Sequence, residues 1–437
     1  NQITIKIQET VYNIFTGEAE KINHKIIDVT LNRCESYLYR TEKGNVSLTG
    51  TTICATEPIA VFQGGQMAAI PITTSETSHI YTQTISTDAW GRVHVITQTK
   101  NQPQNLIRIT AAEPNTKIYR NNETNPIAVL QPLETYEELI DWDTNPSGAV
   151  VYTSSRAVEC YLYETGKNIS NNVFNAPTFT DITPLEHSIH RTLFATFKYR
   201  YDATNELSLS NYVNVVIPVS GIGSITLDGE VIRDAEFRKI PTKINGIEYA
   251  YAQLKVSEGA HVLYSEKAPF VAHVYGYEKT NTGIISYTYS AGRNILHPAW
   301  MLINGVRTDS VAVCEDERPV RFTSVINYDY TDVRWEHHYL QGNSTTIKTP
   351  TLTLSDGTKA TGDSIIDRKY DDIPRGLPLV NHIDTVYMIV SRKTPICKNI
   401  IIDTIKAIVQ VNDTFQIDEN YEKSLNANVC YGEEFTV

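Results

Sequence analysis

The sequence has a deficit of positive charge and lacks long hydrophobic runs. It carries 38 Lys and Arg against 50 Asp and Glu, a formal net charge of −12. Nucleic acids and anionic membranes need clustered Lys and Arg, so we expect neither as the main partner. No run of about eighteen apolar residues occurs, so no segment is expected to insert into a membrane. The first residues, Asn1-Gln2-Ile3-Thr4, contain no Met and no leader pattern. We therefore expect any export signal to have been removed or to lie outside the chain.

Cysteine is sparse. The six residues are Cys34, Cys54, Cys160, Cys314, Cys397 and Cys430, and no two form a C-x-x-C pair. A zinc site or a thioredoxin-like motif therefore has no local support. Two alternatives stay open, buried thiols or one or two long-range disulfides.

The common catalytic motifs are also missing. Gly221-Ile222-Gly223-Ser224 is not a nucleophile elbow, because strand-like residues stand on both sides of it. There is no P-loop, and no G-x-G-x-x-G is followed by a helix. We predict that the protein is not an enzyme and has no catalytic residue, cofactor or metal site.

The residues that are abundant favour β-structure. Tyr occurs 26 times, and Thr, Ile and Val are also frequent, which suits half-buried pleated surfaces. Alternation at Ile3, Ile5 and Ile7 predicts a strand with one buried face. The best helical candidate, Glu134 to Trp142, is short for a helix and is interpreted as an irregular strand. The predicted fold class is all-β, with consecutive immunoglobulin-like β-sandwich domains.

Length and composition predict several domains. At 437 residues the chain exceeds one compact core. We expect a first sandwich unit over 1–165, a polar linker or loop over 167–181, and a second unit over 175–295. A third sandwich covers 305–415, and 425–437 begins a further β domain, because Val313 to Glu317 aligns with Val429 to Glu433. The sequence thus predicts part of a longer multidomain chain.

Two local turns are also predicted. Asp228-Gly229 should form a tight hairpin, because Gly accepts the positive φ that such turns require. Residues 107–119 read as a strand, a short turn and a returning strand. This segment resembles Val213 to Ile217 followed by Ile225 to Leu227, which indicates two related units.

A few polar clusters deserve a test as metal or acid/base sites. On a strand, His187 and His190 would point to opposite faces, so a solvated loop edge is the favoured interpretation. Calcium takes carboxylates on loops, but the acidic pairs lack a complete EF-hand pattern and are interpreted as solvated. These pairs are Asp141 with Asp143 and Asp371 with Asp372. A metal or acid/base cluster could also form from Asp329, Asp332, Glu336, His337 and His338, but adjacent histidines on a strand diverge, so a polar sheet face is the favoured interpretation.

Two aromatic and glycine pairs stand out, Trp90-Gly91 and Tyr275-Gly276-Tyr277. They could form an exposed platform for a glycan or a protein. We favour core aromatics beside a glycine that lets two backbones approach.

An ordered set of segments resembles the IgGFc-binding protein N-terminal domain family. The segments are EPIAVFQGG (57–65), DAWGR (88–92), IRITAAEPNTKIY (107–119), YVNVVIPVSGIGSITLDGE (212–230), EYAYAQLKVSEGAHVL (248–263) and APFVAHVYGYEK (268–279). The form is most similar to the version in large surface proteins of Bacteroidota, often followed by PKD-like domains. Residues 305–415 would be such a domain, with Trp335-Glu336-His337-His338 in place of the usual turn motif.

The resemblance implies a secreted cell-surface adhesion protein that recognises a protein or glycan on another surface through its sandwiches. The alternative is a structural stalk or filament component of a large secreted protein. A hydrolase would need a convergent pocket of carboxylates, or of Ser and His, and no candidate for one is seen.

Overall fold

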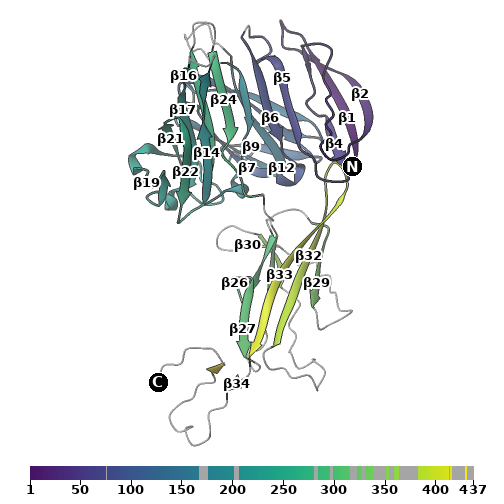
Figure 1. The fold of residues 1–437 in the computed structure, drawn as a ribbon, viewed down its shortest axis with the longest axis vertical. Helices are drawn as coiled ribbons and strands as arrows, with labels where there is room; N and C mark the ends of the chain where they lie inside the picture. The colour runs from purple at the N-terminus through teal and green to yellow at the C-terminus, as the bar shows by residue number, and fades with distance from the viewer. Residues whose placement is uncertain are drawn as a thin grey trace, which may run out of the picture. The chain divides into compact units, whose positions relative to one another are not determined.

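The computed structural model describes residues 1–74, 76–166, 176–200, 206–279, 284–295, 299–314, 322–326, 330–337, 351–353, 359–363, 382–412, 414–415 and 429–430. Strands dominate this part of the chain (Figure 1), which confirms the all-β prediction. The chain divides into two compact units, one of Asn1–Ile295 with Pro395–Cys397 and the other of Leu296–Thr394 with Lys398–Val437. The four-part division stays a prediction.

The first unit opens with a four-stranded sheet. It contains β1 (Gln2–Tyr12), β2 (Ala19–Thr30), β3 (Val46–Ser47) and β4 (Thr52–Ala55), with β1 pairing all three others. Ile3, Ile5 and Ile7 are buried on one face, against Ile27 and Val29 among others. The predicted alternation is confirmed. A separate two-stranded hairpin follows, β5 (Val61–Ala69) with β6 (Thr77–Thr84).

A β-sandwich comes next, built from one seven-stranded sheet organised around a single long strand, β12 (Ala149–Glu164). The 3-10 turn η1 (Thr87–Ala89) precedes β7 (Gly91–Thr97), β8 (Gln104–Ala111), β9 (Thr116–Arg120), β10 (Ala128–Leu130), β11 (Thr135–Asp141), β12 (Ala149–Glu164) and β13 (Thr178–Asp181). The first half of β12 pairs β7 and β9, and the second half pairs β8 and β13. The register of β12 shifts between Thr153 and Val158, and a long strand that is irregular at this point lets the two halves of the sheet close over one core. Ile96, Ile109, Ile118, Val150 and Leu162 are fully buried there.

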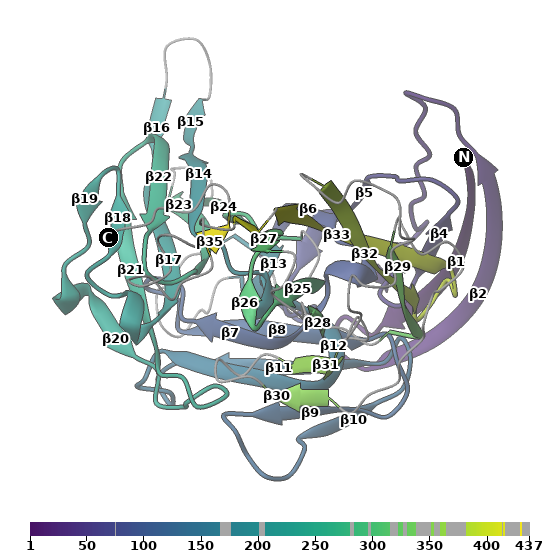
Figure 2. The ribbon, with the colours of Figure 1, turned by 90° about the horizontal axis from the view of Figure 1, so that it is seen from below.

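A second sandwich completes the first unit. Its smaller sheet has the order β14 (Arg191–Thr196), β22 (Gly259–Ser265), β18 (Ile225–Leu227), β19 (Glu230–Val231). The larger sheet has the order β20 (Phe237–Lys239), β21 (Tyr249–Val256), β17 (Ser210–Pro218), β23 (Val271–Lys279), β24 (Ile284–Ser290). Short elements are η3 (Leu185–His187), η4 (Val219–Gly221), η5 (Asp234–Glu236) and the hairpin of β15 (Lys198–Arg200) with β16 (Glu206–Ser208). Figure 2 shows β7 to β12 between this sandwich and the N-terminal sheet.

Glu134 to Trp142 contains strand β11, as predicted. The Asp228-Gly229 turn is confirmed, since both residues have positive φ, 54° and 89°. The two strands predicted over 107–119 are present as β8 and β9, but the predicted return is wrong, because β8 and β9 pair different parts of β12 and not each other. Likewise β17 and β18 belong to different sheets.

The linker expectation is wrong where it can be checked. Residues 167–175 lie outside the described part, but β13 within 176–181 is a buried strand that pairs β12. Phe179 stacks on Tyr163 with ring centroids 5.1 Å apart. The polar threonines on either side of Phe179 concealed the strand, because buried hydroxyls break the apolar pattern on which sequence reading depends.

The second unit is a further two-sheet sandwich. One sheet has β26 (Val306–Arg307), β25 (Ala299–Ile303), β28 (Phe322–Ile326), β31 (Lys359–Asp363) and β30 (Thr351–Thr353). The other has β27 (Ser310–Cys314), β33 (Ile400–Asn412), β32 (His382–Lys393) and β29 (Asp332–His337), and β27 runs parallel to β33. Its core includes Met301, Phe322, Val386, Met388 and Val409. A short pair, β34 (Thr414–Phe415) with β35 (Val429–Cys430), follows.

The cysteines use both of the alternatives left open. Cys54 forms a disulfide with Cys397 across 343 residues of sequence. Cys160 is a buried thiol and Cys34 an exposed one. The side chains of Cys314 and Cys430 lie outside the described residues.

Candidate functional site

The two histidines singled out by sequence do not form a site. His187 is buried at the end of η3, where its Nδ1 lies 2.8 Å from the Asn294 carbonyl oxygen. His190 is exposed, and its Nδ1 lies 2.9 Å from the Ser265 carbonyl oxygen. The expected solvated edge is therefore wrong for His187, because a backbone partner lets the ring be buried.

The acidic candidates are local or dispersed. Asp141 Oδ1 accepts a hydrogen bond from the Asp143 amide at 3.0 Å, which closes a turn. Asp332, Glu336 and His337 lie on strand β29, while Asp329, His338, Asp371 and Asp372 fall outside the described residues. Across the described ranges, no three His, Cys, Asp or Glu side chains come together as a metal site.

The two aromatic and glycine pairs mark close packing. A Cβ on Gly91 would overlap the Pro184 ring. A Cβ on Gly276 would lie 2.5 Å from Asn211 Oδ1 and 2.5 Å from Tyr287 Cε1. Tyr275 is fully buried. The favoured interpretation is confirmed for Tyr275, which is a core aromatic, whereas Trp90 is half-buried. Both glycines allow a close approach, but of neighbouring side chains and not of a second backbone.

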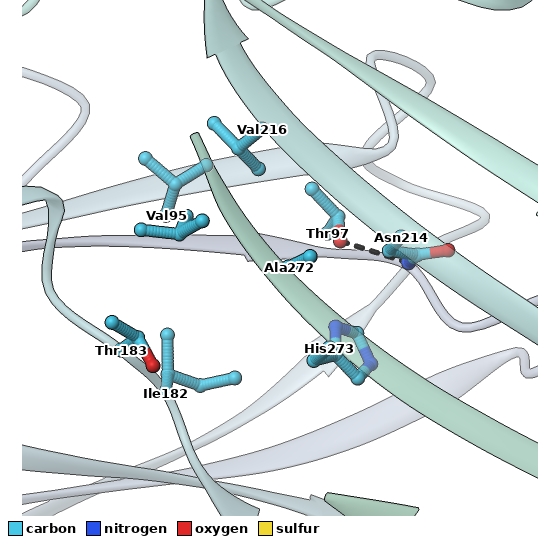
Figure 3. A pocket seen from close by; sticks show the side chains of 9 residues that line it. Val95, Thr97, Ile182, Thr183, Asn214, Val216, Ala272 and His273 are labelled. Atoms are coloured by element: carbon cyan, nitrogen blue, oxygen red, sulfur yellow. Dashed lines mark hydrogen bonds between the residues drawn. The ribbon is translucent and has the colours of Figure 1, made fainter. Parts of the chain in front are cut away.

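A buried hydrogen-bond network joins the two sandwiches of the first unit (Figure 3). Asn214 on β17 donates from Nδ2 to Thr97 Oγ1 and to the Gln98 carbonyl, both at 2.9 Å. Its Oδ1 accepts from the Tyr275 hydroxyl at 3.0 Å, and that hydroxyl accepts from the Lys100 amide at 2.9 Å. Each polar group named in this network has a hydrogen-bond partner. The network therefore favours one relative placement of the two sandwiches.

The cavity at this junction is too small for an organic ligand. It has a volume of about 20 Å³ and is lined by Thr97, Thr183, Asn214 and His273 together with the apolar residues Val95, Ile182, Val216, Val271 and Ala272. A space of this size holds about one water molecule. Burial lowers the pKa of His273 to about 4, so its imidazole is neutral near pH 7.

A second buried group lies around Arg293, which forms an ion pair with Asp181. Glu159 accepts a hydrogen bond from the Tyr161 hydroxyl at 2.6 Å. Burial raises the pKa of Glu159 to about 7, opposed by the Tyr161 hydrogen bond and by Arg293. Burial lowers the pKa of His94 to about 3, and His187 and Arg293 act in the same direction. Perturbed pKa values often mark reaction centres. Here, however, Glu159, His94 and Arg293 do not line the cavity described above.

The outer face of the β14-β22-β18-β19 sheet offers a better contact surface. Its core side is filled by Phe194, Leu263 and Ile225. On the solvent side, Leu193 is 72% exposed, Val231 57% and Tyr264 44%. The outward positions stand in register, with Leu193 opposite Val262, Arg191 opposite Tyr264, and Ala195 opposite Ala260. Solvent-facing positions of an antiparallel sheet are normally polar, so this apolar outer face indicates a place of contact.

Tyrosine hydroxyls occupy the edge of this sheet. The Ala195 amide donates to the Tyr289 hydroxyl at 3.0 Å, and that hydroxyl donates in turn to the Ala195 carbonyl. The Phe197 amide donates to the Tyr287 hydroxyl at 3.4 Å. Both tyrosines come from the β24 region of the larger sheet. The edge therefore stays ordered without a further strand.

Sequence reading missed the outer face, although a signal existed. In Arg191 to Thr196 (RTLFAT), apolar residues occupy both odd-numbered and even-numbered positions, so both faces of the strand carry them. The same is true of His261 to Tyr264 (HVLY). A strand that is apolar on both faces is either covered on both faces or exposes one apolar face to solvent. Only the structure shows which, because it places Phe194 inside and Leu193 outside.

The comparisons with known proteins agree with an all-β binding protein. Residues 1–276 match the family model described as IgGFc binding protein. The match begins at residue 1, before the first quoted segment at residue 57. No curated protein matches the chain.

Proposed function

The chain belongs to the IgGFc-binding protein family, whose model matches residues 1–276, and from this we propose that it is an extracellular, surface-displayed adhesion protein. It binds a protein or glycan of another surface through its β-sandwiches. The family match carries the proposal, because it covers the N-terminal sheet, the first sandwich and most of the second. Fold alone would not carry it.

One further observation supports this location. The disulfide between Cys54 and Cys397 suits an oxidising compartment, where such bonds form and persist. None of the helices in the described residues has the length and hydropathy to cross a membrane. Attachment to a cell surface is part of the proposal.

The outer face is the proposed contact region. Leu193 and Tyr264 supply apolar area on a rigid sheet, and Arg191 adds a positive group beside Tyr264. Tyr and Arg are enriched at the centres of protein interfaces, where they combine apolar area with hydrogen bonding.

The test measures binding to immobilised immunoglobulin Fc, to mucin and to a glycan array. The wild-type chain should bind at least one of these probes, and Leu193→Glu should weaken that binding at least about tenfold, because a charge is placed in an apolar contact. Ile400→Glu on β33 is the matched control, since Ile400 is 71% exposed. No binding by a folded wild-type chain would contradict the adhesion function. Equal binding by both variants would contradict the outer face as the contact region.

A structural stalk or filament component is the second candidate. It is favoured by the second unit, a further sandwich that follows the first unit in sequence and that we propose to be a PKD-like domain. Open-ended assembly seen by electron microscopy, with length rising with concentration, would favour the stalk. Discrete particles would favour adhesion.

A further inference from the structure

The β5–β6 hairpin has an outward face that lacks charge. Between Pro58 and Thr84 the only charged residue is Glu76, in the connection between the two strands. Charged residues make up 20% of the whole chain, so this depletion is local. The exposed residues of the two strands, which we call the hairpin face, are Phe62, Gly64, Gln66, Met67, Thr77, His79, Tyr81 and Gln83.

Large apolar side chains are concentrated on the hairpin face. Met67 is 73% exposed, Tyr81 59% and Phe62 53%. The rings of Phe62 and Tyr81 stack at 5.4 Å between centroids, with only 7° between their planes. Depletion of charge together with exposed Met and aromatic residues is the composition of the centre of a protein interface.

The opposite side of the hairpin is anchored, so the hairpin face is held in place. Gln63 Nε2 donates to the Tyr161 hydroxyl at 2.6 Å, and Ile80 packs against Tyr161, Tyr163 and Phe179. Gly64 pairs with Tyr81, and a Cβ there would overlap the Ile80 carbonyl. Position 64, which pairs with Tyr81 of the aromatic pair, therefore has no room for a side chain.

We propose that the hairpin face is a self-association surface, on which a second copy of this chain docks its own hairpin face. The charge distribution supports this occupant. Two copies with net charge −12 repel each other, and a surface without charge is where they can meet at least cost. The amides of Gln66 and Gln83 both donate and accept hydrogen bonds, so the face can satisfy an identical face in a two-fold arrangement.

The available area is adequate for a weak, specific dimer. An aromatic side chain buries about 150–250 Å² when covered, so the exposed parts of the hairpin face supply on the order of 500 Å² per copy. Two such faces reach roughly 1,000 Å², where specific interfaces begin. A dimer would present two copies of any ligand-binding surface, which raises avidity without a new contact.

The experiment is sedimentation velocity over a concentration series, at mildly alkaline pH where histidine is neutral. It is run at about 50 and about 500 mM salt, which shortens the Debye length from roughly 14 to roughly 4 Å. The wild-type chain should form a dimer, and the dimer should strengthen with salt because like-charged copies are screened. Met67→Glu should raise the dimer Kd at least about tenfold, since it brings two like charges together in the contact.

Ile400→Glu is the matched control for self-association, because Ile400 is 71% exposed on β33, in the second unit. Its dimer Kd should equal that of the wild type, and both variants should keep the wild-type circular dichroism spectrum. A wild-type chain that is monomeric at every concentration and salt would overturn the proposal. So would a dimer that persists in Met67→Glu, or one that weakens with salt. If the wild-type chain is monomeric and Met67→Glu removes its binding to Fc, mucin or glycan, the hairpin face binds an unlike partner and the proposal is overturned. Failure of the proposed function is a separate result, because the dimer is measured without a ligand.

Discussion

The buried histidine at the junction of the two sandwiches makes a sharp prediction about pH. The ordinary pKa of histidine is 6.5, and burial lowers the pKa of His273 to about 4 in the folded protein. Between these values the unfolded chain holds one more proton at this residue than the folded chain does. The unfolding free energy therefore falls as the pH is lowered through this window, by about 1.4 kcal/mol per pH unit.

The perturbation is His273→Gln, which keeps a polar side chain but removes the titrating ring. Between pH 6.5 and 4.5 the wild type should lose about 2 kcal/mol more than the variant, because the slope is only partial at the two ends of this window. Glu159 acts in the opposite direction, because its raised pKa makes the folded chain hold a proton up to about pH 7. His94 acts in the same direction as His273. Both remain in the variant, so their effects cancel in the comparison.

The assay is urea unfolding followed by circular dichroism at several pH values between 7.5 and 4.5. The difference in slope is the readout, since any packing defect shifts the variant by a constant amount. His79→Gln removes an exposed histidine from β6 and serves as the control. Parallel pH profiles for wild type and His273→Gln would refute the reasoning, because they would mean that His273 is hydrated in the folded protein.

Three more predictions concern packing and crosslinking. Gly91→Ala should lower the unfolding free energy by about 1–3 kcal/mol, because the added Cβ overlaps Pro184; a thermal melt at the wild-type temperature would contradict it. Asn105→Ala should cost about 1–3 kcal/mol in urea unfolding, because the Trp142 indole, which donates to Asn105 Oδ1 at 2.7 Å, is left buried without its acceptor. Cys54→Ser should cost about 2–5 kcal/mol by removing the disulfide. Adding reductant should reproduce that loss in the wild type and change nothing in the variant.

The sequence predicted the strands better than the way they are arranged. Alternation found the buried face of β1, because one side of that strand meets water and the other meets core. It could not find the register shift of β12, because pairing to β7 and then to β8 depends on partners far along the chain. Likewise, Thr178 and Thr180 appeared polar, and only the packing of β13 shows that they are buried.

The candidate surfaces were harder to predict than the core. The motif search correctly treated Gly91 and Gly276 as sites of close packing, since glycine has a direct steric meaning. It passed over Leu193 and Met67 because a sequence does not say which side of a strand meets solvent. The buried pair of Arg293 and Asp181 is separated by more than a hundred residues and has no local signature.

The tyrosines at the edge of β14 have a consequence for association between molecules. An unpaired strand edge is a template on which a neighbouring molecule can extend the sheet. The Tyr289 and Tyr287 hydroxyls already take the hydrogen bonds of Ala195 and Phe197 that an incoming strand would need. Removing the Tyr289 hydroxyl should therefore leave the sandwich folded but free the backbone groups of Ala195. Strands of neighbouring molecules can then add to the edge of β14, which leads to aggregation.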